Sequence, residues 1–175
     1  DTLVGPIVLI ITLLALIASW ILRLKVPFLK TASLAFNISG LAMFIFWFPA
    51  LMELGFIGYI LPTSVFFMML VMSVVSAKVF KNQGLWFVSA ISLVPLVFSA
   101  GYLTGEIFES IDYYEDVALY IIPVAYMVLA VIARYLWRSE SSLVRPEAKS
   151  AVAVASFAYA ILGSIFGASA LVSEL

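Results

Sequence analysis

Six long apolar stretches, joined by short polar connections, organise the whole chain. They cover residues 2–22, 31–52, 56–77, 85–105, 117–137 and 148–172. A helix needs about 20 residues to cross the roughly 30 Å of hydrocarbon in a bilayer, and every stretch reaches that length. Each stretch is continuously apolar, whereas a membrane barrel strand alternates its two faces over about ten residues. The pattern predicts an all-α, polytopic integral membrane protein, a bundle of six transmembrane helices.

The charged side chains are sorted between alternate connections. The second and fourth connections hold only acids, with Glu53 in the second. All nine cations lie in or beside the first, third and fifth connections: Arg23, Lys25, Lys30, Lys78, Lys81, Arg134, Arg138, Arg145 and Lys149. Cytoplasmic loops of membrane proteins carry an excess of Lys and Arg. We therefore expect the cationic connections in the cytoplasm, and the acidic connections and both chain ends outside.

Composition supports the same class of protein. Hydrophobic residues make up 65% of the chain and charged residues 11%, against about 45–50% and about 25% in ordinary globular domains. The connections are too short to form a soluble domain, so residues 1–175 are expected to form one transmembrane domain. Its first partner is the lipid bilayer. Any function must lie in the bundle, on its two surfaces or in a partner protein.

Several chemistries lack the residues they need. The chain has no histidine and no cysteine, which removes imidazole proton shuttles, thiol catalysis and the usual ligands of haem and zinc. Neither a hydrolase nucleophile motif nor a phosphate-binding glycine motif occurs. We expect no enzymatic activity, no cofactor, no metal centre with protein thiolate or imidazole ligands, and no nucleic-acid partner.

No ionisable residue lies at the centre of a predicted span. Charged groups inside a bilayer are costly, and where they occur they mark ion pathways and proton relays. Their absence argues against a proton pump or an ion-coupled antiporter.

Small residues recur every fourth position along the sixth stretch, beside a GxxxG pair. They allow close approach of helix backbones, which is how membrane helices gain packing energy. The expected packing residues are Ser156, Ala160, Gly163, Ser164, Gly167 and Ala168. The helix that meets them belongs either to the same bundle or to another subunit.

Two prolines interrupt predicted spans, Pro95 in the fourth and Pro123 in the fifth. Proline removes an amide donor and releases the carbonyl four residues earlier, here those of Ile91 and Leu119. A released carbonyl must face protein or water. One interpretation is a hydrated path for an uncharged solute, lined by Asn37, Ser92, Pro95, Tyr126 and Tyr159. The other is that these residues bond across tolerated kinks.

Acids crowd the fourth connection and the helix end before it. They are Glu106, Glu109, Asp112, Glu115 and Asp116. Carboxylate oxygens are the ligands that calcium and magnesium prefer, and crowded carboxylates can have raised pKa values and so sense acidity. The alternative is a solvated rim that keeps this connection outside.

Two segments carry a family resemblance. Residues 31–33 lead to Asn37 and Gly40 in the second stretch, and the run of residues 84–91 leads to Pro95 in the fourth. Here the chain resembles the small amide and urea channels, which implies six helices, both termini outside and a homo-oligomer. The chain departs from that family at residues 64–71, where the family is rich in aromatics. It also departs in the fifth stretch, which has no tryptophan before Trp137. No pore residue is carried over.

Two functions therefore remain as expectations. The first is a small membrane channel or transporter for a small, uncharged solute. The second is a non-catalytic transmembrane subunit of a larger respiratory or secretory complex. The first implies a solute and other copies of the chain as partners, and the second implies other membrane subunits.

Overall fold

The computed structural model describes residues 4–53, 59–109, 117–139 and 144–173. Within these residues it contains six α-helices and no strand, which confirms the all-α prediction. The helices are α1 (Val4–Lys25), α2 (Lys30–Glu53), α3 (Ile60–Phe80), α4 (Gln83–Glu109), α5 (Val117–Arg138) and α6 (Lys149–Ser173). When only the described residues are considered, five helices, α1, α3, α4, α5 and α6, are long and apolar enough to cross a membrane.

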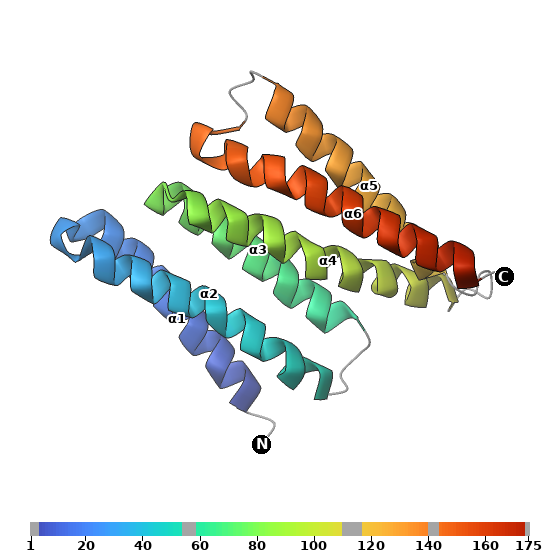
Figure 1. Ribbon diagram of the computed structural model, residues 1–175. Coiled ribbons are helices and arrows are strands. Elements are labelled where there is room, and N and C mark those ends of the chain that lie inside the picture. Colours follow the sequence, from blue (N-terminus) through green and yellow to red (C-terminus); the bar gives the residue numbers. More distant parts are fainter. Residues whose placement is uncertain (1–3, 54–58, 110–116, 140–143, 174–175) are drawn as a thin grey trace.

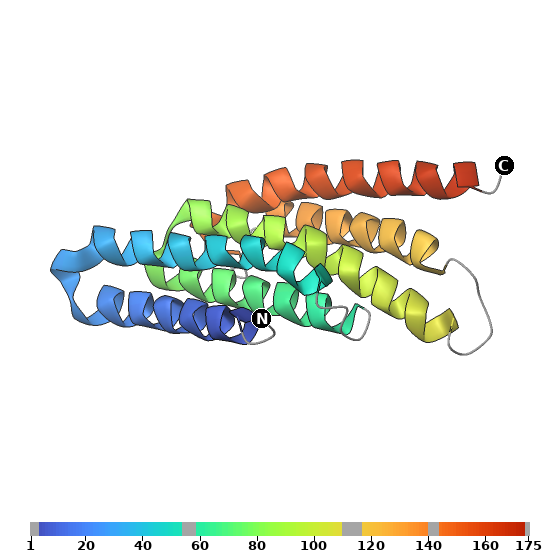
Figure 2. The same ribbon diagram turned by 90° about the horizontal axis from the view of Figure 1, so that it is seen from below.

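The helices form three antiparallel hairpins that lie side by side (Figure 1). The hairpin of α1 and α2 occupies one edge, α3 and α4 lie in the middle, and α5 and α6 occupy the other edge. Figure 2 shows the same row from below, with the helices roughly parallel along their length. The end of α2 and the start of α3 therefore lie at the end of the bundle opposite the hairpin turns, as do the end of α4 and the start of α5.

The hairpin turns follow from local sequence. Short 3-10 turns, Pro27–Leu29 and Pro146–Ala148, precede α2 and α6, and proline suits a first turn because its missing N–H would have no helical partner there. Between α3 and α4 the chain reverses through Lys81, which adopts a left-handed backbone with φ 49°. The Gly84 N–H then donates to Oδ1 of Asn82 at 2.7 Å, which fixes the start of α4.

All three hairpin turns lie at one end of the molecule, and both chain ends lie at the other (Figure 1). We call the first the basic end, because the nine cations lie in or beside these turns. We call the second the acidic end, where α4 carries Glu106. The partition read from the sequence therefore corresponds to two ends of one helical bundle.

The apolar interior has two centres. The first lies among α1, α2 and α3 and is completed by Leu85 at the start of α4; its buried members are Leu16, Leu41, Val65, Met69, Ala77, Phe80 and Leu85. The second lies among α4, α5 and α6, with Ala118, Ile122, Tyr126, Ala130, Ala155 and Tyr159. Helices α3 and α4 pack along each other and join the two centres.

Small residues set how closely the last three helices approach. A methyl group at Gly105 of α4 would lie 3.1 Å from Cβ of Ala118, and one at Gly101 would overlap Ile122. On α6, a methyl group at Gly163 would lie 2.9 Å from Cγ of Met127 and 3.2 Å from the Pro123 carbonyl oxygen. The helix that meets the glycines of α6 is therefore α5 of the same chain.

The packing face expected on α6 is only partly closed. Ser156 and Gly163 are buried, and Ala160 and Gly167 are half-buried, but Ser164 and Ala168 are exposed. Successive residues of a helix are separated by about 100° around its axis, so Gly163 faces α5 while Ser164 points past it. The acidic-end half of the expected ridge, at Ser164 and Ala168, thus lies on the outside of the chain. Its packing against a helix of another subunit stays a prediction.

We predict that leucine is tolerated at position 164 and rejected at position 163. Gly163→Leu forces α5 and α6 apart and should lower the free energy of unfolding by about 1–3 kcal/mol, the usual cost of overpacking. Ser164→Leu points outward and should leave it nearly unchanged. Thermal unfolding of both variants in the same detergent measures the difference. Equal melting temperatures would contradict the described α5–α6 contact.

Candidate functional site

A hydrogen-bonded cluster of polar side chains ties α1, α2 and α3 together. The Nδ2 group of Asn37 donates to Oγ of Ser19 at 3.0 Å and to Oγ of Ser76 at 2.9 Å. The indole N–H of Trp20 donates to the same Ser76 oxygen at 2.9 Å. Asn37, Ser19 and Ser76 are fully buried. We call these four residues the N-terminal polar cluster.

This cluster accounts for the amide at position 37. Asn37 lies on α2, which packs on α1 and α3, and the other predicted path residues lie on α4, α5 and α6. The structure therefore does not bring Asn37 together with Ser92, Pro95, Tyr126 or Tyr159. Its Oδ1 atom is buried and has no hydrogen-bond partner among the described residues, whereas its Nδ2 protons link three helices.

A second polar arrangement connects α5 and α6 to α4. The hydroxyl of Tyr126 donates to the Val94 carbonyl at 2.7 Å, and the hydroxyl of Tyr159 donates to the Ala90 carbonyl at 2.6 Å. Both tyrosines are almost completely buried, and their ring centroids are 6.4 Å apart. We call Tyr126 and Tyr159 the tyrosine pair.

The pair grips α4 immediately before its internal proline. Sequence reasoning singled out the Ile91 carbonyl as the one that Pro95 releases. The carbonyls that receive hydroxyl protons are instead those of Ala90 and Val94, on either side of Ile91. Ile91 itself points outward and is exposed. The tyrosines thus meet the inward side of α4 just before Pro95.

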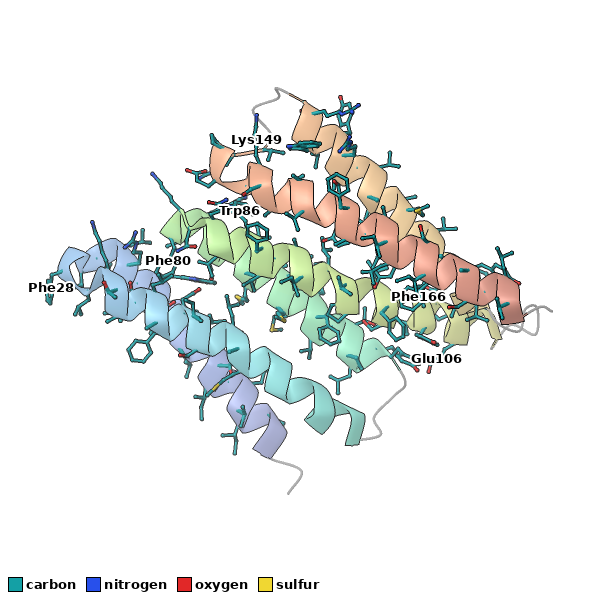
Figure 3. All side chains as sticks on the ribbon, in the orientation of Figure 1. Phe28, Phe80, Trp86, Glu106, Lys149 and Phe166 are labelled. Atoms are coloured by element: carbon teal, nitrogen blue, oxygen red, sulfur yellow. The ribbon has the colours of Figure 1, made fainter. Side chains whose placement is uncertain are left out.

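One cavity lies on the acidic-end side of the tyrosine pair, with a volume of about 250 Å³. The lining residues come from the first half of α3, the second half of α4, and the neighbouring parts of α5 and α6. They are Tyr59, Pro62, Phe66, Val94, Pro95, Phe98, Ser99, Tyr126, Leu162 and Phe166. Phe166 stacks on Tyr126 with ring centroids 5.8 Å apart and lies in the acidic-end half of α6 (Figure 3).

A second cavity, of about 220 Å³, lies on the basic-end side of the pair. Its lining includes Tyr159 and Trp86. Trp86 lies near the start of α4 (Figure 3). The remaining lining residues are Leu70, Val74, Ser89, Ala90, Leu93, Leu129, Ile132, Ala133, Leu136, Ala148, Ala151, Val152 and Ala155. None of the described residues that line either cavity is charged.

The two cavities share no lining residue. Tyr126 borders only the acidic-end cavity, and Tyr159 borders only the basic-end cavity. Ala90 and Leu93 border one cavity, and the next two residues, Val94 and Pro95, border the other. The tyrosine pair and one turn of α4 therefore form the partition between them.

Ser92 is buried but lines neither cavity. Its hydroxyl donates to the Ser89 carbonyl within α4 at 2.8 Å. Ser99, which the predicted path did not include, does line the acidic-end cavity. Ser19 and Ser76 are the main members of the N-terminal polar cluster that sequence reasoning missed. The sequence signal for them was a hydroxyl inside an apolar stretch. Such hydroxyls are also common where the side chain bonds only a carbonyl of its own helix.

The acidic rim is described only at Glu106 and the backbone of Glu109. A carboxylate oxygen of Glu106 accepts the N–H of Tyr59 at 3.2 Å, which joins the end of α4 to the start of α3. Asp112, Glu115 and Asp116 lie outside the described residues. Among the residues that were described, no three acids gather as a cation site would require. The rim as a cation or acidity sensor stays a prediction.

No protein-family model, curated protein or solved structure matches the chain. The resemblance to amide and urea channels accordingly stays a prediction drawn from its two short segments.

We predict that Ser76→Ala destabilises the protein more than Ser73→Ala. The Ser76 oxygen accepts the Trp20 indole N–H and one Nδ2 proton of Asn37, and its loss leaves these two protons without a partner, where a buried unpaired donor costs about 1–3 kcal/mol in the general case. Ser73, one turn earlier on the same helix and equally buried, bonds only the Leu70 carbonyl. Thermal unfolding of the two variants gives the comparison. A larger loss for Ser73→Ala would show that the polar cluster contributes little.

Proposed function

We propose that the chain is an integral membrane protein whose basic end faces the cytoplasm and whose acidic end and termini face outside. Support comes from five helices of sufficient length and apolarity and from the gathering of all cations at one end of the bundle. An inner surface of this charge attracts anionic headgroups and resists translocation.

Within that membrane, we propose, the protein passes a small uncharged solute through its last four helices. The observation that carries this proposal is the pair of cavities on opposite sides of the tyrosine partition. One lies toward each end of the bundle, and the partition between them includes Tyr126, Tyr159 and one turn of α4. The route replaces the sequence-derived path through Asn37, which lies in the N-terminal polar cluster.

The chemistry of the walls selects the solute. The walls of both cavities are uncharged and mostly apolar, so they offer an ion few oxygen ligands in place of its hydration shell, and the ion would lose its water without compensation. A cavity of about 250 Å³ has room for several water-sized groups, since a water occupies about 30 Å³ in the liquid. Small amides and short polyols fit this volume and charge. The small amides are also the class that the family resemblance implies.

The tyrosine pair acts as the barrier. Each hydroxyl holds its ring against α4 through one hydrogen bond to a carbonyl. Interhelical hydrogen bonds in membranes contribute about 0.6 kcal/mol on average, so such a contact can break and re-form readily. A polar solute that offers its own donor to the Val94 or Ala90 carbonyl can take the place of the hydroxyl as it passes.

The first prediction concerns the hydroxyls of the barrier. Removing one hydroxyl without its ring, as in Tyr126→Phe or Tyr159→Phe, should raise solute flux by about threefold, the equivalent of about 0.6 kcal/mol. The measurement is the swelling rate of proteoliposomes in urea or glycerol, alongside ion conductance of the same vesicles. Ser33→Ala is the matched control, because this buried hydroxyl bonds only the Lys30 carbonyl on α2.

The second prediction concerns the cavity. Ser99→Leu places a larger side chain in the acidic-end cavity and should reduce urea flux below the unaltered protein, while Ser33→Ala leaves it unchanged. The channel would be rejected if neither the tyrosine changes nor Ser99→Leu altered the solute flux. Ion currents as large as the solute flux would also reject it. Purification of the protein in a stable complex with other membrane subunits would then favour the accessory-subunit function.

A further inference from the structure

The outer face of α5 and α6 is hollowed along most of its length. At the acidic end the hollow has a volume of about 800 Å³. Its lining includes Tyr120, Val124, Ser164, Ala168 and Leu171, and it is almost entirely apolar. At the basic end a second hollow of about 610 Å³ continues it, lined by Ala130, Arg134, Tyr135, Arg138, Ser156, Phe157 and Ala160 among others.

The two hollows form one groove because they share Met127 and Val131. The part of α5 from Tyr120 to Arg134 rises about 21 Å at about 1.5 Å per residue. One leaflet of hydrocarbon is about half of the roughly 30 Å layer, so the groove is longer than a leaflet is deep. Its small residues, Ser164 and Ala168, are the exposed half of the ridge on α6. They deepen the groove because their side chains are short.

The groove is apolar along its length and cationic at one end only. The Arg134 guanidinium lies 4.7 Å from the ring centroid of Trp137 and 5.5 Å from that of Phe157, which holds it at the groove wall. Arg138 follows one turn later and is exposed. No acid is among the described residues that line either hollow. The groove thus suits an amphiphilic ligand. Its two cations can bind an anionic group, and its apolar length can bind a hydrocarbon chain attached to that group.

We propose that this groove binds a phospholipid with an anionic headgroup, taken from the leaflet at the basic end. The phosphate and any further headgroup anion lie at Arg134 and Arg138. One acyl chain lies along the groove between α5 and α6, over Ser164 and Ala168. Guanidinium groups recognise phosphate oxygens in paired hydrogen bonds, and the neighbouring Tyr135 hydroxyl supplies another donor at the same depth.

Charge also argues against a second copy of the chain as the occupant. Copies in one membrane share one orientation, so a two-fold contact through this face would place the arginines of both copies side by side. Like charges so placed repel, and no described acid of the groove offsets them. An anionic lipid matches both halves of the groove, because its headgroup can pair with the arginines and its acyl chain can occupy the apolar half.

The proposal is tested by native mass spectrometry of the purified protein titrated with phosphatidylglycerol or phosphatidylcholine. Three variants separate the contributions: Arg134→Gln with Arg138→Gln removes the cations, and Ser164→Leu and Ala168→Leu each fill the groove. Lys78→Gln with Lys81→Gln is the control, because it removes two cations from the same end but from α3. The filling positions are exposed, so these variants are expected to fold.

We expect phosphatidylglycerol to bind more tightly than phosphatidylcholine. The arginine variant should weaken its binding at least about tenfold, since each cation near an anionic surface contributes about 1 kcal/mol. The filled variants should weaken it as well, and the lysine variant should not. Loss of binding with the lysine variant equal to that with the arginine variant would reduce the effect to general surface charge. Unchanged lipid binding in both Ser164→Leu and Ala168→Leu would likewise overturn the proposal. So would a dimer of the unaltered protein that dissociates only in these two variants.

Discussion

Apolar surroundings offer no hydrogen bonds, and this single constraint explains where the buried polar side chains of the described residues lie. A buried amide, hydroxyl or freed carbonyl costs several kcal/mol unless the protein itself supplies a partner. The structure answers this constraint twice. In the first half, Asn37 meets Ser19 and Ser76 across three helices. In the second half, Tyr126 and Tyr159 reach across to backbone carbonyls of α4.

The two answers differ in what they do to the surrounding helices. The N-terminal polar cluster joins side chains to side chains, so it fixes α1, α2 and α3 relative to one another. Its apolar neighbours, among them Leu16 and Leu41, fill the remaining space. The tyrosine pair joins side chains to the backbone of a helix that Pro95 interrupts, and the space on either side of it stays unfilled. The polar cluster therefore fixes the helices of the first half, whereas the second half retains two cavities.

Much of the fold could be predicted from the chain because it depends on quantities that are local in sequence. Stretch length and continuity fixed the number and type of the helices, and the ordering of charges fixed which turns share an end. Helix neighbours could not be predicted in the same way. Asn37 and Tyr126 both lie inside apolar stretches, yet the sequence holds no measure of which helices separate them. Depth along a helix follows from counting residues, whereas its neighbours follow from tertiary packing.

The same limit explains the small residues of α6. Their spacing of four predicts one continuous ridge, and beside that ridge Gly163 meets α5. The ridge continues past the contact, however, so Ser164 and Ala168 lie outside it. A stripe of small residues indicates that another group can pack closely on the helix. It does not indicate whether that group is a second helix or a lipid chain. The arginines at one end of the stripe, rather than the stripe itself, are what distinguish the two.

The most direct test of the account is the side from which each cavity can be reached. The chain has no cysteine, so single cysteines can be introduced without other changes. Ser99→Cys, Ala151→Cys and Ser76→Cys report on the acidic-end cavity, the basic-end cavity and the N-terminal polar cluster in turn. With a membrane-impermeant thiol reagent, the account predicts labelling at position 99 from outside only, at position 151 from the cytoplasmic side only, and at position 76 from neither. Labelling of positions 99 and 151 from the same side, or of neither, would contradict it.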